Sequence, residues 1–132
     1  MEGLTISSFI LRPAILAFLA LVPAEWQQAK AEDLPTEIGA CSETTIEDIG
    51  YRLGDPDSGS AISYANGGGQ VSYDTIPEIH RSRVGDPVRL CLVSIPEDCP
   101  PGDDRGKVYS ATNLRTGESW EAPDSQHSCG GA

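Results

Sequence analysis

The chain has 132 residues and a formal net charge of −11, from 20 acidic and 9 basic residues. A chain of this length has room for one small domain with a modest hydrophobic core. Because so acidic a surface repels phosphate backbones, the charge argues against nucleic acid and favours a basic protein or peptide as a partner. The same acids also serve to keep a domain soluble without any partner.

The N-terminal segment predicts an export signal. An uncharged apolar run over residues 13–22 follows Arg12, and the sequence Ala-Lys-Ala at residues 29–31 is typical of a cleavage site. The run is about ten residues long, whereas a membrane-spanning helix needs about twenty. We therefore expect a signal peptide over residues 1–31 and a mature domain over residues 32–132, periplasmic or secreted. The alternative is a segment that is retained as a membrane anchor.

The first element of the mature domain is ambiguous. Residues 49–53 alternate between apolar and other side chains and predict a strand. Thr44 and Glu47 have the spacing of a helix capping box, so residues 44–48 stay open between a short helix and a strand. Residues 54–59, Gly-Asp-Pro-Asp-Ser-Gly, predict an acidic turn.

Two hairpins are expected further along the chain. Residues 61–64 and 70–73 flank an Asn-Gly-Gly-Gly turn, with Ile62 and Tyr64 on one strand face. Residues 107–114 and 119–122 form the second pair, in which Trp120 is expected to anchor the core.

Residues 88–95 are the most hydrophobic run of the mature chain and predict a central strand that is covered on both faces. Together, about six short strands joined by short turns predict an all-β fold. The expected architecture is a small single-domain antiparallel barrel or sandwich.

Four cysteines, Cys41, Cys91, Cys99 and Cys129, lie in the mature domain. In an exported chain this even number predicts two disulfides, which compensate for a small core. Three pairings are possible. We expect Cys41–Cys91, because Cys91 lies in an apolar strand and its partner should also come from regular structure. We expect Cys99–Cys129 because this bond would connect the proline-rich loop to the tail and order both. The spacings lack the C-x2-C pair of zinc sites and redox motifs.

The loop over residues 95–109 is rich in acids and prolines and predicts a stiff, solvated connection. A preordered loop loses less entropy on binding, so it is the best surface for recognition. The candidate binding residues are Asp98, Asp103, Asp104, Arg105, Tyr109 and, in the tail, His127. The leading hypothesis is an exported binding or inhibitor-like domain without enzymatic activity, with a basic protein or peptide as partner.

Two other functions compete with this hypothesis. The acids of the loop have the oxygen ligands that Ca²⁺ prefers, so one alternative is a domain stabilised by Ca²⁺. The other is a small hydrolase that uses His127 or His80 with an acidic residue. Residues 124–127, Asp-Ser-Gln-His, hold the residue types of a catalytic triad, but residues so close in sequence rarely meet triad geometry. We assign no catalytic residue, metal ligand or cofactor.

Overall fold

The computed structural model describes Gly3 and residues 31–131 of the chain. The predicted signal peptide therefore lies outside the described residues, apart from Gly3 and Ala31. The elements are β1 (Cys41–Tyr51), the 3-10 turn η1 (Arg52–Gly54), β2 (Ser60–Tyr64), β3 (Gly69–Ser72), α1 (Pro77–His80), β4 (Pro87–Ser94), β5 (Val108–Asn113) and β6 (Ser119–Pro123). In these residues no helix has the length and apolar character needed to cross a membrane.

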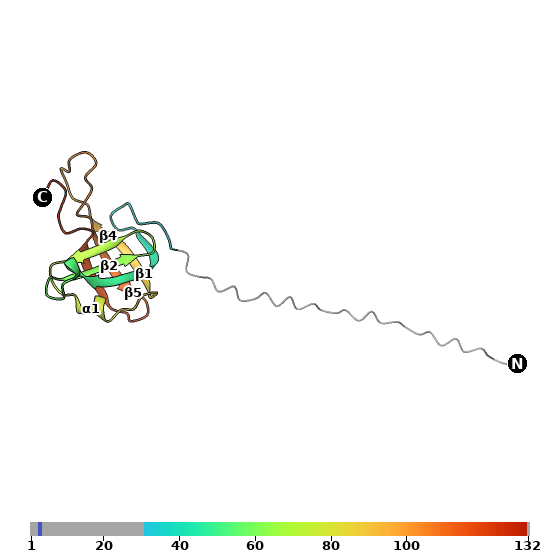
Figure 1. Cartoon of the computed structure of the whole chain (residues 1–132). Helices are drawn as coiled ribbons and strands as arrows, with labels where there is room; N and C mark the ends of the chain where they lie inside the picture. Colours follow the sequence, from blue (N-terminus) through green and yellow to red (C-terminus); the bar gives the residue numbers. More distant parts are fainter. Residues whose placement is uncertain (1–2, 4–30, 132) are drawn as a thin grey trace.

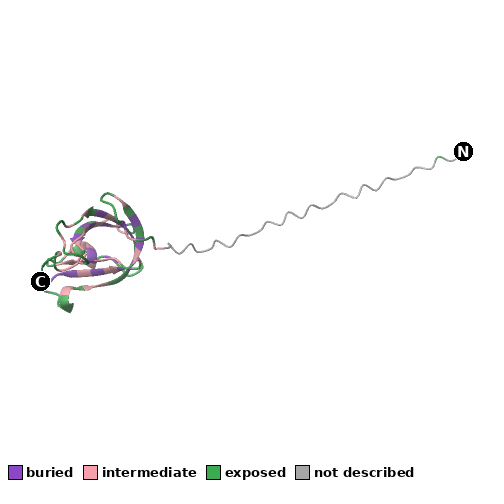
Figure 2. Ribbon diagram, turned by 90° about the horizontal axis from the view of Figure 1, so that it is seen from above, coloured by how far each residue is buried: buried purple, intermediate pink, exposed green. Residues whose placement is uncertain are grey.

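The six strands form one antiparallel sheet in the order β3-β2-β1-β4-β5-β6. The sheet curls into a half-barrel, as Figures 1 and 2 show. Strand β1 is long enough to pair with two neighbours. Its first half pairs with β4 and its second half with β2, with a break in register between Ile46 and Asp48. This architecture confirms the predicted all-β fold of about six short strands.

The hydrophobic core lies on the concave side of the sheet and takes side chains from every strand except β3. It contains Ile46, Ile62, Tyr64, Val88, Leu90, Leu92, Tyr109, Ala111 and Trp120, together with Ile79 from α1. Alternate residues of each strand point inward because successive side chains of a strand face opposite sides of the sheet. The inward positions of Ile62 and Tyr64 and the burial of Trp120 confirm the two predicted hairpins.

The structure decides the element that the sequence leaves open and corrects two expectations. Residues 44–48 belong to β1, because the burial alternates from Cys41 to Ile46 and the backbone pairs first with β4 and then with β2. The strand ends before Leu53, which lies in η1 with a φ of 56°. The structure also contains a one-turn helix that the sequence analysis does not predict, α1, which begins with Pro77 and ends at His80.

The second correction concerns β4. Its burial alternates, with Val88, Leu90 and Leu92 inside and Arg89, Cys91 and Val93 outside. The prediction that both faces of this strand are covered is therefore wrong. The run appears continuous in the sequence because Cys91 and Val93 occupy outward positions, and Val93 is 38% exposed.

A buried glutamine links the two ends of the sheet. Gln70 of edge strand β3 accepts hydrogen bonds from the Tyr64 hydroxyl at 2.6 Å and from Trp120 Nε1 at 2.9 Å. Its amide nitrogen donates to the carbonyl oxygens of Tyr109 at 2.7 Å and Ala122 at 3.1 Å. The Gln70 side chain thus connects β3 to both β5 and β6. These hydrogen bonds favour the curled shape of the sheet.

Candidate binding site

Two segments project together from one end of the half-barrel (Figure 1). One is the loop that joins β4 to β5, residues 95–107, and the other is the chain after β6, residues 124–131. We call these two segments the loop–tail unit. It contains the predicted binding residues except Tyr109.

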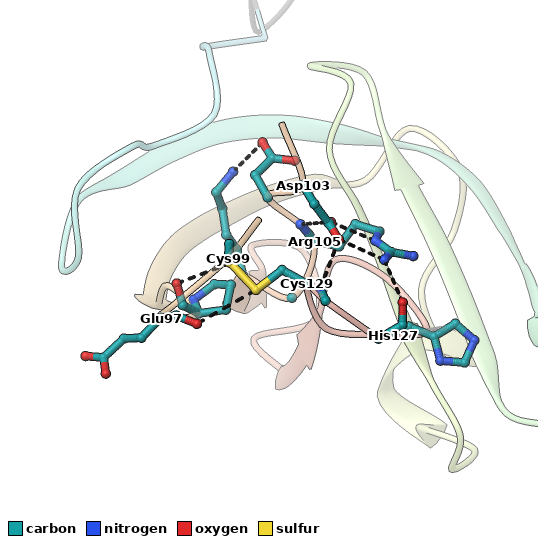
Figure 3. Close-up of a disulfide and its surroundings, with 12 residues drawn as sticks. Glu97, Cys99, Asp103, Arg105, His127 and Cys129 are labelled. Carbon is teal, nitrogen blue, oxygen red and sulfur yellow. Dashed lines mark hydrogen bonds and ion pairs between the residues drawn. A yellow bond between two sulfur atoms is a disulfide. The ribbon is translucent and has the colours of Figure 1, made fainter. Parts of the chain in front are cut away.

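The disulfide Cys99–Cys129 joins the two segments, with a Cα–Cα distance of 5.2 Å (Figure 3). The backbone N–H of Cys129 also donates to the carbonyl oxygen of Arg105 at 2.7 Å. This disulfide between the loop and the tail is the one predicted from the sequence. The other predicted disulfide, Cys41–Cys91, is also present.

Arg105 fastens the loop to the tail a second time. Its Nε and one terminal nitrogen donate to the two carboxylate oxygens of Asp103, both at 2.9 Å (Figure 3). The same terminal nitrogen reaches the carbonyl oxygen of Gly131 at 3.2 Å, and Asp103 accepts from the N–H of Gly130 at 3.0 Å. The hydrogen bonds from Arg105, and then that from Gly130, hold the pKa of Asp103 well below its ordinary value. Asp103 and Arg105 therefore hold the loop in shape.

The other candidate residues of the unit face solvent. Asp98 and His127 are exposed, and the Asp104 side chain is 84% exposed although it pairs with Lys107 at 3.2 Å. Tyr109 differs from them, because it is only 5% exposed and packs in the core at an inward position of β5. Its ring is thus out of reach of a partner.

The base of the tail is anchored by residues that sequence reasoning missed. The Arg52 guanidinium lies over the ring of Tyr73, 4.1 Å from its centroid, and donates to Gln126 Oε1 at 3.2 Å. The Tyr73 hydroxyl donates to the Gln126 carbonyl at 3.2 Å, and Asp124 accepts from the N–H of Gly106 at 2.8 Å. No short-range pattern signals contacts between residues more than fifty positions apart.

The two histidines have separate surroundings. His80 Nε2 shares a hydrogen bond of 2.8 Å with Ser60 Oγ, and its ring stacks on Tyr51 with 4.6 Å between centroids. Ser60 is fully buried, so its hydroxyl is closed to a substrate. His127 lies exposed in the tail, where its carbonyl accepts from Ser125 Oγ. Across residues 31–131, neither imidazole is hydrogen-bonded to a carboxylate.

The acids of the loop are divided between different partners. Asp103 bonds Arg105, and Asp104 pairs with Lys107. In the described part of the chain, no three His, Cys, Asp or Glu side chains lie where they would share a metal ion. The geometry therefore lends no support to a Ca²⁺ site in this loop.

Two shallow cavities lie over the sheet. One, of about 210 Å³, is lined by Glu32, Cys41, Ser42, Glu43 and Arg89. The other, of about 240 Å³, extends across β1, β2 and β3 to Asp124. Both are smaller than the roughly 300–1,000 Å³ that small-molecule sites usually have. Neither of these two cavities therefore has the volume of a typical small-molecule site.

Comparison of the chain with protein-family models, with curated proteins and with solved structures found no match. The function is therefore argued from the geometry of the chain itself.

Proposed function

We propose that residues 32–132 form an exported domain that binds a basic protein or peptide through the loop–tail unit, without catalysing a reaction. The two disulfides support export, because such bonds are typical of proteins that mature in oxidising compartments. The observation that carries the proposal is the double fastening of the loop to the tail, by Cys99–Cys129 and by Arg105.

This fastening matters because it orders a projecting surface before any partner arrives. An ordered loop loses less conformational entropy on binding, so more of the contact energy appears as affinity. An inhibitory domain presents such a loop to the enzyme that it blocks, and the proposal includes this case.

The charges of the unit support a basic partner. Glu97, Asp98 and Asp104 are exposed, whereas Asp103 is engaged by Arg105. The chain as a whole carries a net charge of −11, which attracts a basic partner over a distance set by ionic strength. Binding should therefore weaken as salt is added, mainly through slower association.

The test compares two variants that lose the same charge in different places. Asp98→Asn with Asp104→Asn neutralises the exposed acids of the loop, and Asp57→Asn with Asp74→Asn neutralises two exposed acids elsewhere. Each purified mature domain is immobilised and challenged with envelope and medium fractions of the source organism at low and high salt. The retained partner is then titrated against the three proteins.

We expect a partner whose retention falls with salt and whose affinity is about tenfold weaker for the loop variant than for the control. Absence of a retained partner would contradict the proposal. So would retention that ignores salt, or equal affinities for the two variants.

A further inference from the structure

The second disulfide, Cys41–Cys91, lies on the outer surface of the sheet. Cys41 of β1 and Cys91 of β4 are directly opposite in the register, with a Cα–Cα distance of 4.0 Å that is typical of a non-hydrogen-bonded pair. Cys41 is exposed and Cys91 is partly exposed, because both occupy outward positions of their strands. The bond is therefore open to reagents in solution.

Cys41 is the more exposed residue of the two. The cavity of about 210 Å³ beside β1 is lined by Cys41 together with Glu32, Glu43 and Arg89. Thiol–disulfide exchange depends on which sulfur an attacking thiolate reaches. The cavity favours attack at Cys41 Sγ, which makes Cys91 the leaving group.

Arg89 is suited to assist this departure. It lies two residues before Cys91 on β4, so both side chains point to the same outer face. A neighbouring arginine stabilises a thiolate, and a more stable thiolate leaves faster. Arg89 also borders the cavity from which the attack would come.

We propose that Cys41–Cys91 is a thiol–disulfide exchange site, at which an external dithiol reduces the bond while the sheet stays folded. One thiolate of the dithiol attacks Cys41 Sγ, the Cys41–Cys91 bond breaks, and Cys91 leaves with the electron pair and takes a proton from water. The second thiol, deprotonated, then attacks the mixed disulfide and releases Cys41, which is protonated in turn. The dithiol ends as a disulfide and the protein gains two electrons and two protons.

The sheet has other bonds that hold β1 against β4 after reduction. Beyond the disulfide, the N–H of Leu92 donates to the carbonyl of Ala40 at 3.0 Å. On the other side, the backbone pairing continues from Ser42 and Leu90 to Thr45 and Pro87. Reduction therefore has a local effect, and the loop–tail unit keeps its own disulfide.

The charges around the cavity also give the site a preference among thiols. The carboxylates of Glu32 and Glu43 line it, so an uncharged dithiol approaches more easily than an anionic thiol. Dithiothreitol and glutathione are convenient probes of these two kinds. This inference does not depend on the binding function proposed above.

The experiment follows the reduction of the native protein by dithiothreitol without denaturant. Samples are alkylated at intervals, and the labelled cysteines are mapped by mass spectrometry, while Trp120 fluorescence reports the fold. We expect Cys41 and Cys91 to be labelled roughly tenfold faster than Cys99 and Cys129, with unchanged fluorescence. Labelling of Cys99 and Cys129 first, or of all four together with unfolding, would overturn the proposal.

Three variants test the roles of the charges. Arg89→Gln should slow labelling of Cys41 and Cys91 several-fold, whereas the control Arg83→Gln, which alters another exposed arginine, should not. Glu43→Gln should speed the reaction with glutathione and leave that with dithiothreitol nearly unchanged. Equal rates for the two arginine variants would overturn the assigned role of Arg89, and a glutathione rate unaffected by Glu43→Gln would overturn the preference among thiols.

Discussion

Gln70 shows how a single polar residue contributes to the shape of the whole sheet. Its side chain is 1% exposed and uses both lone pairs of its oxygen and both N–H groups of its nitrogen. A buried amide is tolerated only when it is hydrogen-bonded in this way. The Tyr64 hydroxyl beside it is also buried, and this burial raises the pKa of Tyr64 well above its ordinary value. The two aromatic donors therefore depend on Gln70 as their acceptor.

Replacing Gln70 by leucine should lower the free energy of unfolding by about 2–5 kcal/mol, because it leaves the Tyr64 hydroxyl and Trp120 Nε1 buried without an acceptor. Urea unfolding followed by the fluorescence of Trp120 measures the loss. Tyr64→Phe is the matched variant, since it removes one of the two donors. In the double variant the loss should be smaller than the sum of the single losses. Additive losses, or a Gln70→Leu variant as stable as the parent, would show that these bonds contribute little.

At the scale of elements, the loop–tail unit contains no helix or strand of its own. Its order comes from the disulfide and the Arg105 hydrogen bonds between the loop and the tail. The hydrogen bonds of Gln126 with Arg52 and Tyr73 hold its base. Long segments without helix or strand are disordered unless something ties them down. The disulfide and the Arg105 bonds are therefore the cause of its shape.

Removal of Cys99–Cys129 by a double serine substitution should lower the free energy of unfolding by about 3–4 kcal/mol, as expected for a disulfide with a sequence separation of 30 residues. Hydrogen exchange should accelerate in residues 95–106 and 124–131 and stay slow in β1, β4 and β5. The matched variant removes Cys41–Cys91 by the same substitutions, and exchange in the loop–tail unit should then match that of the parent. Faster exchange there in both variants would mean that the order of the unit depends on the whole fold.

In the molecule as a whole, acidic residues outnumber basic residues, and several of the basic side chains form ion pairs. Among the described residues, Arg81, Arg105, Lys107 and Arg115 are each in an ion pair. The pair of Arg115 with Asp86 is the most enclosed, because Asp86 is 6% exposed and also accepts from Asn113 at 2.9 Å. These hydrogen bonds, led by that of Arg115, hold the pKa of Asp86 well below its ordinary value. Acid therefore acts on the fold through this carboxylate and through Asp103.

The sign of the pH dependence follows from this shift. In the unfolded chain the Asp86 carboxyl has a pKa of about 4, and in the folded chain its pKa is lower. The folded state thus binds fewer protons between these two values, so the stability is present above about pH 4 and is lost as the pH falls through the folded pKa.

Asp86→Asn should make the protein less stable at neutral pH, and its difference from the parent should shrink as the pH drops below about 4. Urea unfolding between neutral and strongly acidic pH measures both proteins. Asp74→Asn, at an exposed position, is the control and should follow the parent throughout. A difference between Asp86→Asn and the parent that stays constant with pH would contradict the assigned role of Asp86.

Several features of this protein could be predicted because they depend on neighbours in the sequence. Glycine-containing turns and alternating side chains indicate hairpins locally, so the sequence predicts β2–β3 and β5–β6 and places Trp120 in the core. The even number of cysteines and their positions in a strand, a loop and a tail were enough to favour the pairing that is present. The capping-box spacing of Thr44 and Glu47 was misleading, because pairing with two neighbouring strands outweighs a weak local preference for helix.

By itself, then, the sequence determined the all-β class, the hairpins, the disulfides and the acidic, proline-rich character of the loop. Only the tertiary structure decided that β4 is covered on one face, that Tyr109 points into the core, and that Asp103 and Arg105 fasten the tail. It alone also placed Gln70 against the carbonyl groups of Tyr109 and Ala122. The physical reason is that local patterns depend on turn geometry and the period of a strand, whereas coverage and long-range hydrogen bonds depend on how far the sheet curls.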